Sequence, residues 1–202
     1  MTIKTNKLYG LILTGGKSKR MGTDKGSLNY HGKTQVEHLY ELLEGLTDKT
    51  FISCREDQAN LDHLKSFPKV LDAFDDLGPS GGILSAFKQD PNASWLVLAC
   101  DMPYLNRESL VHLIKNRDTN QVATCFFNGE KKWPEPLCAI YEPSSVERIN
   151  HFVNLGKPCP RKVLMNSDVK ILEPLQEKVL LNANTLSDLE SFKKEKELSH
   201  EA

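Results

Sequence analysis

A glycine-rich, cationic loop between residues 14 and 26 carries the side chains best suited to chemistry. Its cationic side chains are Lys17, Lys19, Arg20 and Lys25, interspersed with Gly15, Gly16, Gly22 and Gly26. Glycines let backbone N–H groups approach a ligand closely and point into a shared concavity. Because the whole chain has a net charge of −1, this local positive charge indicates a small anionic ligand rather than a nucleic acid. We therefore expect the loop to bind a polyphosphate.

Two common phosphate-binding motifs do not fit this loop. Gly16-Lys17-Ser18 imitates the end of a P-loop, but that motif requires glycine at position 11, which is Leu11. The dinucleotide spacing G-x-G-x-x-G is also absent, because Gly15 and Gly16 are adjacent. The loop is therefore a third kind of phosphate site, or else a glycine-rich surface turn with solvated lysines.

The elements that must position this loop follow from the apolar pattern. Leu8–Leu13 is a short apolar run, and Trp95–Cys100 is a continuous run suited to the centre of a parallel sheet. Further strands are predicted at 49–54, 69–71, 122–127, 137–141, 169–172 and 178–181, and helices after Thr34, at 55–66, 83–88, 107–115, 143–154 and 161–165, and after Thr185. Strand–helix alternation through residue 120 predicts an α/β fold with an open, mostly parallel, Rossmann-like sheet flanked by helices in three layers, α/β/α.

Three polar segments lie just past strand ends in this arrangement. Residues 14–25 follow the first strand, Asp72 follows the strand at 69–71, and Asp101 follows Trp95–Cys100. In such sheets ligands bind at the carboxyl ends of the strands, so these segments should meet at one edge.

Asp101 is the strongest candidate metal ligand. Mg²⁺ typically binds one or two protein carboxylates together with substrate phosphates, and the alternative role for Asp101 is a cap before Met102-Pro103. Lys25 and Arg20 would neutralise charge on a leaving pyrophosphate, or else face solvent. Arg161, beside a glycine and two prolines, is a further candidate phosphate contact.

Residues 13–25, L-T-G-G-x-S-x-R-M-G-x-D-K, resemble the signature of the small nucleotidyltransferases, and more narrowly of the molybdenum cofactor guanylyltransferases. Further landmarks at 78–82, 100–104, 135–141 and 182–189 extend the resemblance over essentially the whole chain. It implies a nucleotide-diphospho-sugar transferase-like fold and the transfer of GMP from GTP to molybdopterin cofactor, with Mg²⁺ and release of pyrophosphate. The implied partners are GTP and molybdopterin cofactor as substrates, with transient contacts to cofactor-synthesis proteins and acceptor apoenzymes.

The resemblance also implies a set of site residues. The nucleotide would contact Leu13, Thr14, Gly15, Gly16, Lys25, Ser53, Asp72, Gly78, Pro79, Gly82 and Asp101. Catalysis would depend on Arg20, Lys25 and Asp101, with Asp101 holding the metal. Asn182 and Asn184 match an Asn-x-Asn-Thr segment on the acceptor side.

Several of these assignments leave an alternative open. Asp75 and Asp76 compete with Asp72 for the nucleotide, and all three would also suit a solvated acidic loop. Gly78–Gly82 would suit a tight turn, and the two asparagines an Asx-type turn before a helix. Thr14 and Ser53 depart from the family, which usually has Ala and often Asn at these positions.

Length and composition predict a single domain over 1–202, with a nucleotide-binding half at 1–120, an acceptor-side half at 121–190 and a frayed tail at 194–202. Five widely spaced cysteines and the absence of a signal peptide or transmembrane run predict a cytoplasmic protein that binds neither membrane nor nucleic acid. We expect a monomer.

The rival functions are a cytidylyltransferase or sugar-1-phosphate nucleotidyltransferase, and a non-catalytic nucleotide-binding module. Gly15 favours GTP over CTP, since related cytidylyltransferases have Ala-Gly there.

Overall fold

The computed structural model describes residues 7–14, 25–183, 185, 187, 188, 190–192 and 194. The predictions for Gly15, Gly16, Arg20 and Asn184 therefore lie outside the described residues, as does the side chain of Lys25. The backbone of Lys25 opens a 3₁₀ helix, Lys25–Ser27. No helix in the described part of the chain is long and apolar enough to cross a membrane.

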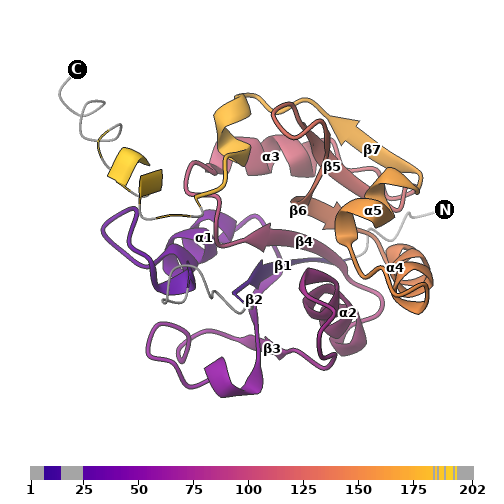
Figure 1. Cartoon of the computed structure of the whole chain (residues 1–202), viewed down its shortest axis with the longest axis horizontal. Coiled ribbons are helices and arrows are strands. Elements are labelled where there is room, and N and C mark those ends of the chain that lie inside the picture. Colours follow the sequence, from indigo (N-terminus) through magenta and orange to yellow (C-terminus); the bar gives the residue numbers. More distant parts are fainter. Residues whose placement is uncertain are drawn as a thin grey trace.

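One seven-stranded sheet runs through the molecule in the order β3-β2-β1-β4-β6-β5-β7 (Figure 1). The strands are β1 Leu8–Leu13, β2 Lys49–Cys54, β3 Lys69–Leu71, β4 Ser94–Ala99, β5 Ala123–Asn128, β6 Trp133–Tyr141 and β7 Val169–Leu172. Pairing is parallel except at β6, which lies antiparallel between β4 and β5. The expected open, mostly parallel sheet is confirmed.

The chain reverses its direction of travel across the sheet beside β1. From β1 it moves outward to β2 and β3, then returns past β1 to place β4 on the other side. Crevices at the carboxyl ends of strands open at such a switch point, and this one lies between the segments that follow β1 and β4. Thr14 and Asp101 leave the sheet there.

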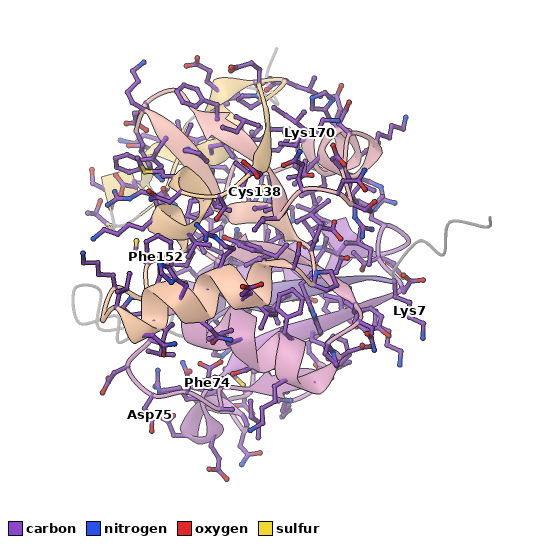
Figure 2. The ribbon with its side chains drawn as sticks, turned by 90° about the vertical axis from the view of Figure 1, so that its right-hand side faces the viewer. Lys7, Phe74, Asp75, Cys138, Phe152 and Lys170 are labelled. Carbon is purple, nitrogen blue, oxygen red and sulfur yellow. The ribbon has the colours of Figure 1, made fainter. Side chains whose placement is uncertain are left out.

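Helices cover both faces of the sheet, which completes the three layers. They are α1 Gln35–Leu43, α2 Pro79–Gln89, α3 Arg107–Lys115, α4 Ser145–Asn154 and α5 Pro160–Met165. One core lies under α1 and α3, and the other under α2, α4 and α5. Figure 2 looks onto the second face, where α4, with Phe152 labelled, lies beside α2. The strand β4, buried along its whole length, separates the two cores.

Most predicted elements form where the pattern places them. Thr34 caps α1 by accepting a hydrogen bond from the Glu37 N–H, and the Thr185 hydroxyl accepts one from the Asp188 N–H. The five cysteines are free, and four of them are buried.

Four predicted boundaries or elements are wrong. Helix α2 begins at Pro79 rather than residue 83, because proline suits the first helical position. Strand β6 begins at Trp133 rather than 137. It accommodates two prolines there because β4 pairs only with its later part, Cys138 to Tyr141.

The other two errors concern short apolar stretches. Residues 55–66 form a 3₁₀ helix, Glu56–Gln58, followed by turns, since Leu61 and Leu64 are too few for an amphipathic helix. The expected strand at 178–181 is instead part of a 3₁₀ helix, Glu177–Leu180. Its adjacent residues Val179 and Leu180 are both buried in one core, whereas a strand would turn them to opposite faces.

Candidate active site

The ends of β1 and β2 are joined at the first residue of the glycine-rich loop. Both the backbone N–H and the hydroxyl of Thr14 donate to the carbonyl oxygen of Ser53, at 3.1 and 2.8 Å. Thr14 is buried, so its hydroxyl needs such a partner. The family usually has alanine at this position, so Thr14 adds a side-chain hydrogen bond between the loop and β2.

Ser53 also connects β2 to Asp72, which follows β3. The Ser53 hydroxyl donates to Asp72 Oδ1 at 2.7 Å. Burial raises the pKa of the Asp72 carboxyl, and the hydrogen bond from Ser53 and the nearby Arg55 charge act in the opposite direction. Asp75 and Asp76, by contrast, are exposed. The geometry thus distinguishes Asp72 from its two acidic neighbours as the carboxylate held at the strand ends.

Helix α2 packs one of its glycines, Gly82, against this group. A Cβ at Gly82 would lie 2.5 Å from Ser53 Oγ, 2.9 Å from Leu13 Cδ2 and 3.5 Å from Asp72 Oδ1. Gly82 is therefore what allows the helix to approach Leu13, Ser53 and Asp72 together. Gly78 has a positive φ of 54° and directly precedes Pro79, so the predicted glycine cluster combines a turn with a helix start.

Asp101 is held by the segment near the C-terminus. The Asn182 side-chain amide donates to Asp101 Oδ1 at 2.8 Å, and the Ala183 N–H donates to the Asp101 carbonyl at 2.7 Å. The structure thus brings together two predicted site residues that are separated by 81 positions in the chain.

A buried tyrosine lies on one side of this carboxylate. Tyr30 is 3% exposed, and its hydroxyl has no hydrogen-bond partner among the described residues. Burial, followed by the Asp101 charge, raises the pKa of Tyr30 to about 12. The Asp101 charge therefore acts on a buried phenol close to it.

One residue that the sequence did not single out, Lys131, completes the site together with Glu135. Lys131, in the turn between β5 and β6, donates to Asn182 Oδ1 and, at 3.1 Å, to Glu135 Oε2. Glu135 is 3% exposed, and it also accepts a hydrogen bond from the Asn128 amide at 2.9 Å. Residues 135–141 stood out as a landmark of the family, but nothing in the sequence links Lys131 to Asp101.

A cavity of about 560 Å³ opens beside Asn182. Its lining includes Tyr104, Lys131, Asn182, Asp188 and Ser191. Tyr104 also contacts a cation, since Lys178 Nζ lies 5.9 Å from its ring centroid. The lining combines an aromatic ring, the Lys131 ammonium and the carboxylates of Glu130 and Asp188, so it suits a flat ligand with several polar groups.

The donor set at this edge fits a hard divalent cation only in part. Among the described residues, no group of three or more His, Cys, Asp or Glu side chains could hold a metal. Asp101 supplies a single carboxylate, which suits a cation whose other ligands come from a nucleotide's phosphates and water.

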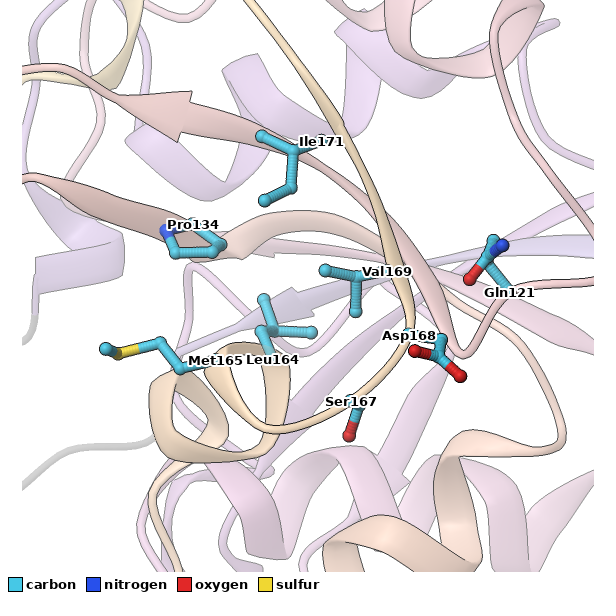
Figure 3. Close-up of a pocket in the computed structure, with 8 residues that line it drawn as sticks. All are labelled: Gln121, Pro134, Leu164, Met165, Ser167, Asp168, Val169 and Ile171. Atoms are coloured by element: carbon cyan, nitrogen blue, oxygen red, sulfur yellow. The ribbon is translucent and has the colours of Figure 1, made fainter.

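Arg161 contacts the first residue of β6. Its guanidinium packs over the Trp133 ring, 4.3 Å from the centroid, at the start of α5. A second cavity, of about 520 Å³, lies between α5 and β7, where Leu164 and Met165 face Val169 and Ile171 (Figure 3). Its lining includes no predicted site residue and shares none with the cavity beside Asn182, so the two cavities are separate.

The chain matches a known family over most of its length. Residues 10–191 match the model of the MobA-like NTP transferase domain. The chain is 30% identical over 180 residues to a molybdenum cofactor guanylyltransferase of Pseudomonas fluorescens, covering 87% of this chain and 88% of that protein. It is 36% identical over 186 residues to a molybdenum cofactor biosynthesis bifunctional protein of Synechocystis sp., covering 92% of this chain but only 54% of that protein.

The fold is shared with a solved structure. A molybdopterin-guanine dinucleotide biosynthesis protein A from Archaeoglobus fulgidus superposes with a TM-score of 0.75, covering 94% of this chain and 98% of that one. The two sequences are 23% identical, so this likeness supports the fold alone.

Proposed function

The chain belongs to the MobA-like NTP transferase family, so it is a nucleotidyltransferase, and we propose that it transfers GMP from GTP to molybdopterin cofactor. The observation that carries the choice of reaction is the match to the Pseudomonas fluorescens guanylyltransferase across 88% of that protein's length. The chain spans about half of the Synechocystis protein, so only part of that bifunctional protein corresponds to it.

The nucleotide occupies the ends of β1, β2 and β3. The loop that follows Leu13, with Gly15, Gly16, Arg20 and Lys25, binds the triphosphate, since backbone N–H groups and cations both favour phosphate oxygens. The group formed by Ser53, Asp72 and Gly82 gives the nucleoside a polar contact and a flat, close-packed floor. The glycine and proline at 78 and 79 border the same space.

Chemistry takes place between this loop and Asp101. A terminal phosphate oxygen of the acceptor attacks the α-phosphorus of GTP, the bond to the bridging oxygen breaks, and pyrophosphate leaves with that oxygen. Lys25 and Arg20 stabilise the charge on the leaving group. Asp101 would hold Mg²⁺, which neutralises phosphate charge and orients the reacting groups. Asn182 holds the Asp101 carboxylate in place for this role.

The acceptor lies on the side of the C-terminal half, 121–190. The cavity beside Asn182 is large enough for a flat ring system, and Tyr104 and Lys131 provide stacking and charge at its wall. Asn184 follows in the same segment. Asn182 therefore borders both the metal ligand and the acceptor, as expected for a residue at the reacting centre.

Pyrophosphate release by the purified protein tests this reaction. With Mg²⁺ and molybdopterin cofactor, GTP should give release and CTP much less, because Gly15 leaves room for a purine and pocket discrimination of one methylene is worth roughly 10–200-fold. Release from CTP alone would replace the guanylyl assignment with a cytidylyl one. No release from any nucleotide, with binding intact, would support a non-catalytic module.

Lys25→Ala gives a second measurement on the same assay. Loss of a charge-assisted contact worth about 1.5–3 kcal/mol should lower kcat/KM by tenfold or more while Tm stays near wild type. A lower Tm with unchanged kinetics would make Lys25 structural.

A further inference from the structure

We propose that Lys131 is a positioning residue for Asp101 and acts through Asn182, an inference that rests on the proposed function. Lys131 donates to Asn182 Oδ1, and the Asn182 amide nitrogen donates to Asp101 Oδ1 at 2.8 Å. The three residues come from the turn between β5 and β6, the C-terminal segment and the end of β4. Lys131 is therefore connected, through Asn182 in the C-terminal segment, to the residue that follows β4.

The donor chemistry of lysine fixes the orientation of the amide. An asparagine side chain can present either its oxygen or its nitrogen to a neighbour, but a lysine ammonium only donates. Lys131 therefore requires the oxygen of Asn182 on its own side, which turns the NH₂ group toward Asp101. Without Lys131, the amide would keep only its bond to Asp101 and would be free to swing about it, so the carboxylate would be held less firmly.

Lys131 is itself held by a buried acid. Its ammonium lies 3.1 Å from Glu135 Oε2, and Glu135 is 3% exposed on β6. The other contacts of Glu135 come from the Asn128 amide at 2.9 Å and from the Leu137 N–H at 3.3 Å. The Asn128 side chain in turn accepts a hydrogen bond from the Lys131 N–H. This network anchors the ammonium to the sheet.

The intervening amide keeps the cation from neutralising the carboxylate. A lysine in direct contact with Asp101 would compete with Mg²⁺ for the same oxygens, whereas a neutral amide orients the carboxylate and leaves its charge to the metal. Partners that orient metal ligands commonly change metal affinity by about 10–100-fold when they are removed.

Lys131→Met tests this role, with Lys132→Met as the matched control. Lys132 is the neighbouring, exposed lysine, so its replacement removes the same charge from the same turn. In Lys131→Met the Mg²⁺ concentration for half-maximal activity should rise about tenfold with little change in the KM for GTP. Lys132→Met should behave as wild type, and Lys131→Arg, which also only donates, should restore most of the Mg²⁺ response. If Lys131→Met does not fold, Lys131→Gln serves instead, with a smaller shift expected in the same direction.

A measurement on the metal-free protein is independent of turnover. The Asn182 side-chain NH₂ signals, identified by their loss in Asn182→Ala, should exchange with water faster in Lys131→Met than in wild type or Lys132→Met. In the Asn182→Ala background, Lys131→Met should add no further shift in the Mg²⁺ response. Equal amide exchange in the two lysine variants, or a full additional shift in that background, would overturn the role of Lys131. The absence of pyrophosphate release in wild type would instead count against the proposed function, and the amide measurement would still decide the role of Lys131.

Discussion

Gly82 lies so close to Ser53 that a Cβ at position 82 would stand 2.5 Å from Ser53 Oγ. The same Cβ would stand 2.9 Å from Leu13 Cδ2, so helix α2 has no lateral space at this point. The contact brings the buried start of α2 onto the ends of β1 and β2, where Ser53 donates to Asp72. The stability of α2 and the shape of the nucleotide site are therefore coupled at one glycine.

Gly82→Ala should destabilise the protein and weaken nucleotide binding together. Overpacking of a filled core costs about 1–3 kcal/mol, so we expect a fall in Tm of roughly 2–12 °C at this chain length. Thermal unfolding and GTP titration of the same samples measure both effects. Adding Ser53→Ala removes the nearest atom, so the double variant should recover part of the lost Tm. A Gly82→Ala variant as stable as wild type would contradict the close packing.

Asp72→Asn should stabilise the nucleotide-free protein at neutral pH. Burial raises the pKa of Asp72 in the folded state above its ordinary value of 3.8, so ionisation costs the fold free energy. That cost is absent below pH 3.8, develops as pH rises toward the folded-state pKa, and is complete above it. The Tm gain of Asp72→Asn over wild type should therefore be present at pH 7 and fade on acidification, while affinity for GTP falls. A gain that grows toward low pH would contradict the direction of the pKa shift.

Local sequence signals predict the fold and the part of the candidate site that lies directly after the strands. Asp72 and Asp101 come directly after apolar runs, and the edge rule for parallel sheets places such residues at the same edge of the sheet, whereas their spacing along that edge depends on the strand order. Gly82 was identified by the family pattern, and the structure adds the physical reason in its distance to Ser53.

The remaining part of the site depends on contacts between distant segments. Lys131 in the turn between β5 and β6 contacts Asn182, 51 positions further along the chain, and no periodicity in the sequence predicts a contact between such distant segments. The short apolar run at Val179 and Leu180 fits a strand as well as a 3₁₀ helix, and tertiary packing selects the helix.

Arg117→Met should destabilise the fold without affecting the site. Arg117 donates to both oxygens of Glu142, at 2.6 and 2.9 Å, and to Ser94 Oγ at 2.6 Å, with side-chain exposures of 11% and 2% for the ion pair. Removing one partner of a buried pair costs about 3–5 kcal/mol, which lowers Tm by roughly 6–20 °C here. Ser94 begins β4, at the opposite end from Asp101, so the Mg²⁺ response should be unchanged below the Tm. Lys115→Met, an exposed change at the last residue of α3 and two positions before Arg117, is the control.

Asp101→Asn should abolish most Mg²⁺-dependent turnover while leaving the protein folded. Asparagine keeps an oxygen that can accept the hydrogen bond from Asn182, and the backbone carbonyl still accepts from Ala183. It lacks the charge that a hard cation requires, and metal stabilisation of phosphate charge is worth several kcal/mol, so kcat/KM should fall by about 100-fold or more. Tm should stay within about 4 °C of wild type, since the hydrogen bonds from Asn182 and Ala183 are kept. Asp75→Asn, an exposed neighbour of Asp72, removes the same charge away from the strand ends and should retain wild-type kinetics. Wild-type activity in Asp101→Asn at matched Mg²⁺ would refute the metal assignment, whereas equal losses in both variants would indicate a general effect of charge.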